Sequence, residues 1–311
     1  MLELPDSWTW DFWLADTGTE YHLFFLFASR ALGEESRRHR RASIGHAVST
    51  DLVTWTRVSD ALVRSDTPSA DDVATWTGSI VQADDGEWHL FFTGCSDDPV
   101  PTAQRVMVAT STDLMHWRKS PAVIAAADPR WYATGADGPD EPFRDPWVFS
   151  SGGQWHMLIT ARAPSGEPTE TGIIGHVTSP DLLQWEVQPP VTGAGHGFGQ
   201  LEVPQVVEID GRWLVLFSCL RAELAPWRRD TDAGGGVWMA EADGPLGPFH
   251  LENARRLTDE SLYSGRVIQD RCGAWQFLAF ENYRKGEFVG RLSDPVPFAE
   301  LRVRTVPASA G

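Results

Sequence analysis

The stretch "GEWHLFFTG", residues 86–94, leads to the fold of this chain, because its pattern occurs five times. A polar turn is followed by an aromatic residue and a short apolar run, which is typical of a buried β-strand entered from a turn. The other copies are "TEYHLFFLF" (19–27), "GQWHMLITA" (153–161), "GRWLVLFSC" (211–219) and "GAWQFLAFE" (273–281). The sequence is therefore an array of similar units.

A second type of segment follows each of the first. The first three copies are "IGHAVSTDLVTWTRV" (44–58), "VMVATSTDLMHWRKS" (106–120) and "IIGHVTSPDLLQWEVQ" (173–188). Each predicts a strand, an Asx-type turn at the aspartate and another strand, with the tryptophan covering the turn. Two degenerate copies, "VWMAEADGPLGPFHLE" (237–252) and "FVGRLSDPVPFAELRV" (288–303), complete the array.

Each repeat thus holds about four short antiparallel strands. Such a small sheet cannot bury both of its faces alone, so neighbouring copies must stack. We predict an all-β fold, a five-bladed β-propeller with four-stranded antiparallel blades. A sixth, unrecognised blade is the alternative, although the five copies run nearly from end to end. We expect residues 1–311 to form this single domain, without a C-terminal β-sandwich, and most of the 15 tryptophans to pack between blades.

The composition argues against several classes of partner. The formal net charge of −17 disfavours nucleic acid and anionic membrane surfaces, which both attract basic patches. The one basic run, "RRHRR" at 37–41, is expected to be a solvated hairpin tip. No signal peptide or membrane span is evident. Cys95, Cys219 and Cys272 are far apart and odd in number, which indicates buried free thiols and a cytoplasmic protein.

A third type of segment precedes each "EWHLFF" copy and is expected to be the innermost strand of its blade. The five are "TWDFWLAD" (9–16), "TWTGSIVQ" (75–82), "FRDPWVFS" (143–150), "LEVPQVVE" (201–208) and "LYSGRVIQ" (262–269). Because innermost strands line the central channel, equivalent side chains should meet there. We align Asp11, Ser79, Asp145, Glu202 and Arg266. Three acids from three blades therefore converge in one pocket.

Crowded carboxylates are unfavourable unless they bind cations or carry out chemistry. Two carboxyl groups in an aromatic pocket fit glycoside hydrolysis, in which one protonates the leaving oxygen and the other attacks the anomeric carbon or activates water. We expect Arg144 to bind sugar hydroxyls and to keep Asp145 ionised. Each acid alone could equally be structural. The predicted substrate contacts are Trp10, Trp13, Trp76, Ser79, Phe143, Arg144, Gln200 and Arg266.

These motifs resemble the catalytic propellers of glycoside hydrolase families 32 and 68, which act on fructans. "FRDP" (143–146), "WTGS" (76–79) and "LEVPQ" (201–205) are similar to elements of their third, second and fourth blades, and "TWDFW" (9–13) is similar to the first-blade element of family 68. The resemblance implies that Asp11 is the nucleophile, Asp145 the transition-state stabiliser and Glu202 the acid/base.

The resemblance implies a retaining β-fructofuranosidase that acts on sucrose, fructo-oligosaccharides or fructans, with transfructosylation as a further activity. Two alternatives stay open: an inverting arabinofuranosidase similar to family 43, and a non-catalytic propeller that binds carbohydrate. No metal-binding motif and no obligatory cofactor are expected. The sequence leaves open the exact sugar and linkage, the oligomeric state and a structural ion in the channel.

Overall fold

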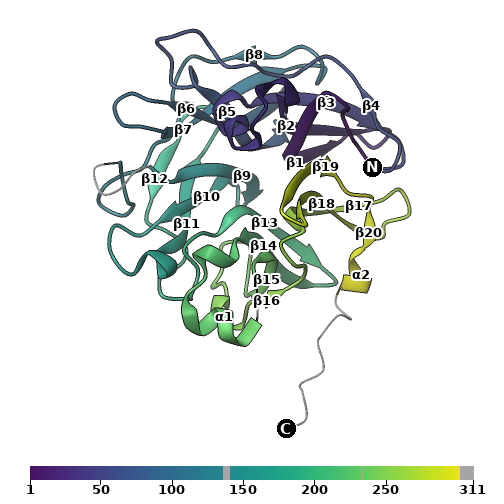
Figure 1. Cartoon of the computed structure of the whole chain (residues 1–311). Coiled ribbons are helices and arrows are strands. Elements are labelled where there is room, and N and C mark those ends of the chain that lie inside the picture. The colour runs from purple at the N-terminus through teal and green to yellow at the C-terminus, as the bar shows by residue number, and fades with distance from the viewer. Residues whose placement is uncertain (136–140, 233, 302–311) are drawn as a thin grey trace.

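The computed structural model describes residues 1–135, 141–232 and 234–301. These residues form five four-stranded sheets arranged around a central axis (Figure 1). Neighbouring strands are antiparallel in every sheet. The predicted all-β, five-bladed β-propeller is confirmed. Residues 302–311 of the predicted domain 1–311, which include the last two residues of the repeat segment 288–303, lie outside the described residues.

The strands follow the repeats along the chain, and each blade begins with its innermost strand. Blade 1 holds β1 (Ser7–Asp16), β2 (Tyr21–Ser29), β3 (Ser43–Ser49) and β4 (Thr56–Arg57). Blade 2 holds β5 (Ala74–Gln82), β6 (Trp88–Ser96), β7 (Ala103–Ser111) and β8 (Arg118–Lys119). Blade 3 holds β9 (Phe143–Ser151), β10 (Gln154–Arg162), β11 (Gly172–Ser179) and β12 (Glu186–Gln188). Blade 4 holds β13 (Glu202–Ile209), β14 (Arg212–Cys219), β15 (Gly236–Ala242) and β16 (Arg255–Arg256). Blade 5 holds β17 (Leu262–Gln269), β18 (Trp275–Arg284), β19 (Glu287–Leu292) and β20 (Val296–Pro297).

Helices occur only as short connections in the described part of the chain. They are the 3₁₀ helices η1 (Arg30–Leu32), η2 (Glu35–Arg41), η3 (Pro168–Glu170), η4 (Arg221–Glu223) and η5 (Leu251–Asn253), and the α-helices α1 (Pro226–Asp232) and α2 (Phe298–Leu301). None of these helices has the length and apolar character needed to cross a membrane.

The predicted Asx turns are present in blades 1 to 3. In blade 1, the Asp51 carboxylate accepts hydrogen bonds from the backbone amides of Val53 and Thr54 at 2.8 and 2.7 Å. Leu52 has a φ of 64°, and the indole of Trp55 donates to its carbonyl at 3.1 Å. The same contacts recur at residues 111–117 and 179–185. The tryptophan of the repeat thus closes a strained turn.

A β-bulge interrupts each innermost strand near its start. The first residue of each bulge is Asp11, Thr77, Asp145, Val203 or Ser264, and the residues directly before them are Trp10, Trp76, Arg144, Glu202 and Tyr263. Bulges redirect side chains and are common beside active sites. They also correct the alignment expected from sequence: Glu202 is equivalent to Arg144, while Ser79 and Arg266 lie beyond the bulges of their strands.

The ring closes where the N-terminus meets blade 5. Leu2 and Leu292 form an isolated bridge, with a 2.9 Å hydrogen bond from the amide of Leu292 to the carbonyl of Leu2. The hydroxyl of Thr9 donates to the carbonyl of Gly290 at 3.2 Å. These bonds join segments that are almost the full chain length apart.

All three cysteines are free. Cys95 and Cys219 are buried, as expected. The expectation of burial is wrong for Cys272, which is exposed because it lies in the turn between β17 and β18.

Candidate active site

A pocket of about 370 Å³ lies where the innermost strands begin, and all five blades contribute to it. The bulges explain this convergence, because they turn two consecutive residues of a strand toward the axis. The residues at these bulges that line the pocket are Trp10, Asp11, Trp76, Thr77, Arg144, Asp145, Glu202, Val203 and Tyr263. The structure thus brings Asp11, Asp145 and Glu202 together.

Asp11 is held by hydroxyl groups from two other blades. One of its carboxylate oxygens accepts a hydrogen bond from Thr77, and the other accepts one from Ser264. Thr77 and Ser264 lie in the bulges of blades 2 and 5, at the positions equivalent to Asp11 in blade 1. The side chains of these three equivalent residues therefore hydrogen-bond to one another through Asp11. Burial raises the pKa of Asp11 above its ordinary value, and the two hydroxyl donors oppose that rise.

Asp145 lies in a left-handed backbone conformation, with a φ of 57°. Its carboxylate accepts hydrogen bonds from the hydroxyl of Thr160 at 2.9 Å and from the amide of Val203 at 3.2 Å. Arg144 Nε is 3.5 Å from the same oxygen. Burial nevertheless raises the pKa of Asp145 to about 6, because desolvation outweighs the attraction of Arg144. The expectation that Arg144 keeps Asp145 ionised therefore applies only above about this pH.

Glu202 is bound through both of its carboxylate oxygens. One accepts a 2.6 Å hydrogen bond from Arg144 Nη2, and the other accepts a hydrogen bond from the hydroxyl of Tyr263. Arg144 therefore bridges Glu202 and Asp145. This contact explains why an arginine and an aspartate are adjacent at the start of an otherwise apolar strand.

Glu223 is an acid of the pocket that sequence reasoning missed. It lies in η4, which follows the second strand of blade 4, and it lines the pocket beside Glu202. Burial raises its pKa to about 7, and the charge of Glu202 adds to the rise. Arg162 lies 3.6 Å from Glu223 Oε1, whereas Oε2 is buried without a hydrogen-bond partner in the described part of the chain. No repeat signal could identify Glu223, because it lies in a loop outside the three repeated segments.

The basic run 37–41 lies in η2, in the connection of the antiparallel pair β2 and β3, and four of its five residues are exposed, as expected. The expectation is wrong for Arg38, which is buried, and both Arg38 and His39 line the pocket. Arg38 is buried: its guanidinium forms an ion pair with Glu35 and lies 3.8 Å from the ring centre of Phe288. The carbonyl of His39 accepts a 2.7 Å hydrogen bond from the indole of Trp76. The burial of one arginine against an aromatic ring could not be read from a run of charges.

Four of the eight predicted substrate contacts line the pocket: Trp10, Trp76, Arg144 and Gln200. The other four, Trp13, Ser79, Phe143 and Arg266, are buried outside its lining. The prediction needs correction for these four, because their side chains are buried among other residues of the protein.

The contacts of these buried residues are structural. Ser79 accepts a hydrogen bond from the amide of Val148 at 3.0 Å. Arg266 donates to the carbonyls of Val203 and Pro204 at 3.2 and 2.7 Å. Phe143 packs edge-on against Tyr132, and Trp13 stacks on Phe24.

No group of three or more histidine, cysteine, aspartate or glutamate side chains suited to a metal ion occurs in residues 1–135, 141–232 and 234–301. The carboxylates of Asp11, Asp145 and Glu202 accept hydrogen bonds from hydroxyl, amide and guanidinium donors.

The fold is similar to that of known fructan-active enzymes. An inulosucrase from Halalkalicoccus jeotgali bound to kestose has a TM-score of 0.74 and 22% sequence identity, over 93% of this chain and 81% of that chain. Levansucrase from Gluconacetobacter diazotrophicus has a TM-score of 0.74 and 18% identity, over 96% of this chain and 79% of that chain. At this level of identity the similarity concerns the fold.

Two relatives are similar in sequence. A sucrose-6-phosphate hydrolase of Bacillus subtilis (strain 168) is 28% identical over 229 residues, which are 72% of this chain and 43% of that protein. An insoluble β-fructofuranosidase isoenzyme of Arabidopsis thaliana is 31% identical over 199 residues, which are 62% of this chain and 34% of that protein. The chain spans less than half the length of these relatives. Residues 13–270 match the sequence model of the glycosyl hydrolases family 32 N-terminal domain, and the chain therefore belongs to this family.

Proposed function

We propose that this chain is a retaining glycoside hydrolase of the β-fructofuranosidase type, acting on sucrose, fructo-oligosaccharides or fructans. The observation that carries the proposal is the meeting of Asp11, Asp145 and Glu202 in one pocket, with Arg144 bound to two of them. Membership of family 32 supports this reaction class, as do the names of the two relatives.

In this proposal Glu202 and Asp11 divide the two steps of a retaining hydrolysis. Glu202 donates a proton to the glycosidic oxygen while Asp11 attacks the anomeric carbon, so that the leaving group departs as an alcohol and a glycosyl ester forms on Asp11. Glu202, now a carboxylate, then takes a proton from a water molecule as the water oxygen bonds to the anomeric carbon and the ester bond to Asp11 breaks. Asp11 is restored as a carboxylate and Glu202 as an acid. The hydroxyls of Thr77 and Ser264 hold the carboxylate of Asp11 in place for attack.

Asp145 and Arg144 position the sugar ring, and Asp145 stabilises the positive charge that develops on it. An ionised Asp145 favours an oxocarbenium-like transition state and accepts hydrogen bonds from sugar hydroxyls. Arg144 links Asp145 to Glu202, so the stabilising group and the acid/base keep a constant relative position. If an acceptor sugar replaces water in the second step, the same residues support transfructosylation.

The proposal is tested by assays with sucrose, 1-kestose, inulin and nitrophenyl arabinofuranoside, with product anomers followed by NMR. We expect activity on the fructosides. Asp11→Asn and Glu202→Gln should each lower kcat by at least about a thousandfold, as is usual for members of a catalytic pair. The matched control Asp84→Asn changes the charge equally at an exposed position and should leave kcat unchanged.

Methanolysis of the substrate separates the enzyme mechanisms. A retaining enzyme gives a methyl fructoside with the anomeric configuration of the substrate. Inverted product at the earliest time points would remove the nucleophile role from Asp11. Cleavage of the arabinofuranoside alone would replace the proposed sugar class.

A further inference from the structure

A buried hydroxyl group recurs at one position of the repeat, on the second strands of blades 2, 3 and 4. It belongs to the last residue of "WHLFFT" (88–93), "WHMLIT" (155–160) and "WLVLFS" (213–218). Each of these residues is paired in the ladder with the residue directly before the bulge of its own blade. The side chains of all three are fully buried, and none of them lines the pocket.

Each of these hydroxyl groups accepts a hydrogen bond from the backbone of the next blade. The donor is the amide of the residue that begins the bulge of that blade. The three pairs are Thr93 with the amide of Asp145 at 3.0 Å, Thr160 with that of Val203 at 3.2 Å, and Ser218 with that of Ser264 at 2.9 Å. A hydroxyl group of one blade therefore holds the bulge of the next blade, three times in succession.

The three bulges that receive this hydrogen bond begin with a left-handed residue. Asp145, Val203 and Ser264 have φ values of 57°, 53° and 50°. Asp11 and Thr77, which begin the bulges of blades 1 and 2, do not have a positive φ. The blades that precede these two, blades 5 and 1, hold Phe280 and Leu26 at the position of the hydroxyl residue. The left-handed bulge and the hydroxyl acceptor thus occur together.

The need of a buried amide for an acceptor explains this pairing. A residue in a bulge has no partner on the neighbouring strand, so the ladder provides no acceptor for its amide. A buried amide without an acceptor costs free energy. A left-handed conformation is also unfavourable for a residue with a Cβ atom, and it persists where the surrounding structure fixes it. The hydroxyl group of the preceding blade meets both needs.

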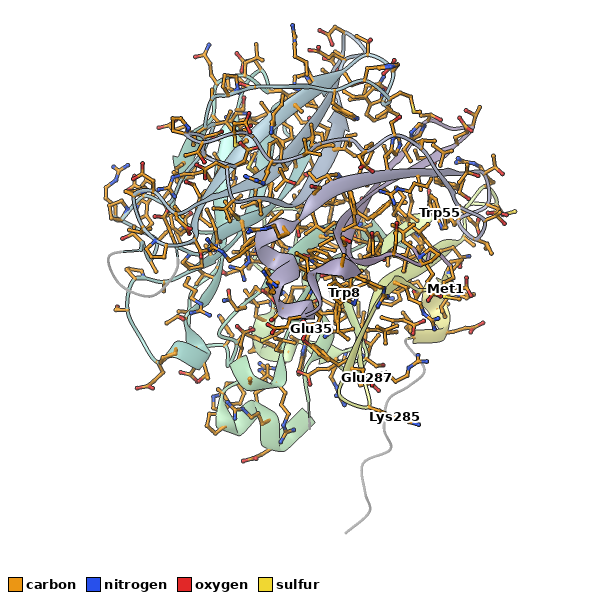
Figure 2. All side chains as sticks on the ribbon, turned by 45° about the horizontal axis from the view of Figure 1, so that its top comes forward. Met1, Trp8, Glu35, Trp55, Lys285 and Glu287 are labelled. Atoms are coloured by element: carbon orange, nitrogen blue, oxygen red, sulfur yellow. The ribbon has the colours of Figure 1, made fainter. Side chains whose placement is uncertain are left out.

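The seam between blades 5 and 1 is held by a different contact. There the hydroxyl of Thr9 on β1 donates to the carbonyl of Gly290 on β19 at 3.2 Å. Figure 2 shows this seam, with Trp8 of β1 and Glu287 of β19 on its two sides. The bulge of blade 1 therefore keeps its place without a hydroxyl acceptor on the second strand of blade 5.

Two of the three hydroxyl contacts lead to carboxylates of the pocket. Thr93 holds the backbone of Asp145. Ser218 holds the backbone of Ser264, whose own hydroxyl donates to Asp11. Resting on the function proposed above, we propose that Thr93 and Ser218 are positioning residues of the hydrolysis. They act through backbone amides and fix the directions in which Asp145 and Ser264 present their side chains.

The first test separates the hydroxyl of Thr93 from its methyl group. Thr93→Val keeps the shape of the side chain but removes the acceptor of the Asp145 amide, whereas Thr93→Ser keeps the hydroxyl. In Thr93→Val, kcat for the fructoside that the wild type cleaves fastest should fall about tenfold, with a smaller change in KM, because Asp145 acts mainly on the transition state. Thr93→Ser should keep most of the wild-type kcat.

The second test applies the same comparison to Ser218. Ser218→Ala removes the acceptor of the Ser264 amide and should lower kcat by a similar factor. Ser218→Thr keeps a hydroxyl and should retain activity. The matched control is Thr192→Val, because the buried Thr192 accepts a 2.8 Å hydrogen bond from the amide of Ile174 and does not line the pocket. This control loses the same kind of contact and should keep the wild-type kcat.

The kcat values are compared per folded enzyme, so a loss of stability alone does not count as support. An unchanged kcat in Thr93→Val and Ser218→Ala overturns the positioning role and leaves the proposed function standing. An equal fall of kcat in Thr93→Ser, or in Thr192→Val, also overturns it, because packing or stability would then be the cause. Absence of activity on every fructoside in the wild type would instead reject the proposed function.

Discussion

At the scale of single residues, the pocket depends on how each carboxylate is hydrogen-bonded. Asp11 accepts only from hydroxyl groups, Glu202 from a guanidinium and a phenol, and Asp145 from a hydroxyl and an amide. The three acids therefore have different hydrogen-bond environments although they line the same pocket. Pairs of acids in different environments are how one site holds both an acid and a base.

The hydroxyl of Thr160 gives a direct test of the role of Asp145. Thr160→Val keeps the side-chain volume but removes the 2.9 Å hydrogen bond to the carboxylate. Loss of a donor to the charged form should raise the pKa of Asp145 above its present value of about 6, by roughly one unit. Because the ionised form is the active one in the proposed mechanism, the acid limb of the kcat/KM profile should move to higher pH by the same amount.

The control for this variant is Thr178→Val, on β11 of the same blade and outside the pocket lining. Its acid limb should coincide with that of the wild type. If the limb also stays in place in Thr160→Val while the enzyme remains active, Asp145 is not the group that limits activity at low pH.

At the scale of elements, the innermost strands combine ladder pairing with a bulge. Pro146 and Pro204 lie in two of these bulges, where the residue has no cross-strand partner and a missing amide hydrogen is tolerated. Gly78 follows the bulge of blade 2, directly after Thr77. A Cβ atom at Gly78 would lie 1.9 Å from the carbonyl oxygen of Phe91.

Gly78→Ala should therefore separate β5 from β6. We expect a loss of about 1–3 kcal/mol in the free energy of unfolding, which is usual for overpacking a buried contact, measured by urea denaturation. Thr77 should move with the strand, so kcat should fall as well. Gly193→Ala, where a Cβ atom meets nothing within 4 Å, should change neither quantity. Full stability in Gly78→Ala would contradict the close approach of the two strands.

At the scale of the whole molecule, histidine pairs that are buried or partly buried connect neighbouring strands in two blades. His22 and His46 are 3.0 Å apart in blade 1, and His156 and His176 are 3.1 Å apart in blade 3. Burial lowers the pKa of His46 to about 3 and that of His176 to about 4, and the neighbouring histidine adds to each shift. The folded protein therefore holds these side chains neutral.

Stability should consequently decrease in mild acid. Between the folded pKa of His46, about 3, and its ordinary value of 6.5, the unfolded chain binds more protons than the folded chain. The contribution of neutral His46 to the free energy of unfolding is complete above this ordinary pKa and is lost as the pH falls toward the folded pKa. From about pH 7 to about pH 5, His46 accounts for up to about 2 kcal/mol of the free energy of unfolding.

His46→Gln removes this titration and should flatten the pH dependence of stability, measured by urea denaturation at several pH values. Its stability at neutral pH is expected to be lower, because the histidine also stacks on Phe24 at a ring distance of 4.5 Å. His196→Gln, in the loop before blade 4, serves as the control. An equal loss of stability in acid for wild type and His46→Gln would show that other groups are responsible.

The sequence by itself determined the number of blades, the Asx turns and the three acids. These follow from local patterns: alternation of apolar residues, turn chemistry at Asp51, Asp113 and Asp181, and a repeat that must stack to bury its sheets. Such signals are contained within about fifteen residues, so they can be read before the chain is folded.

Only the tertiary structure decided which side chains face the pocket. Each innermost strand has a bulge near its start, and the bulges placed Thr77 and Ser264 beside Asp11, rather than Ser79 and Arg266, which lie two positions further along their strands. Glu223 and Arg38 reach the pocket from the short 3₁₀ helices η4 and η2, which lie in connections between strands and carry no periodic signal. Their positions depend on contacts between segments far apart in the chain, and local sequence does not encode those contacts.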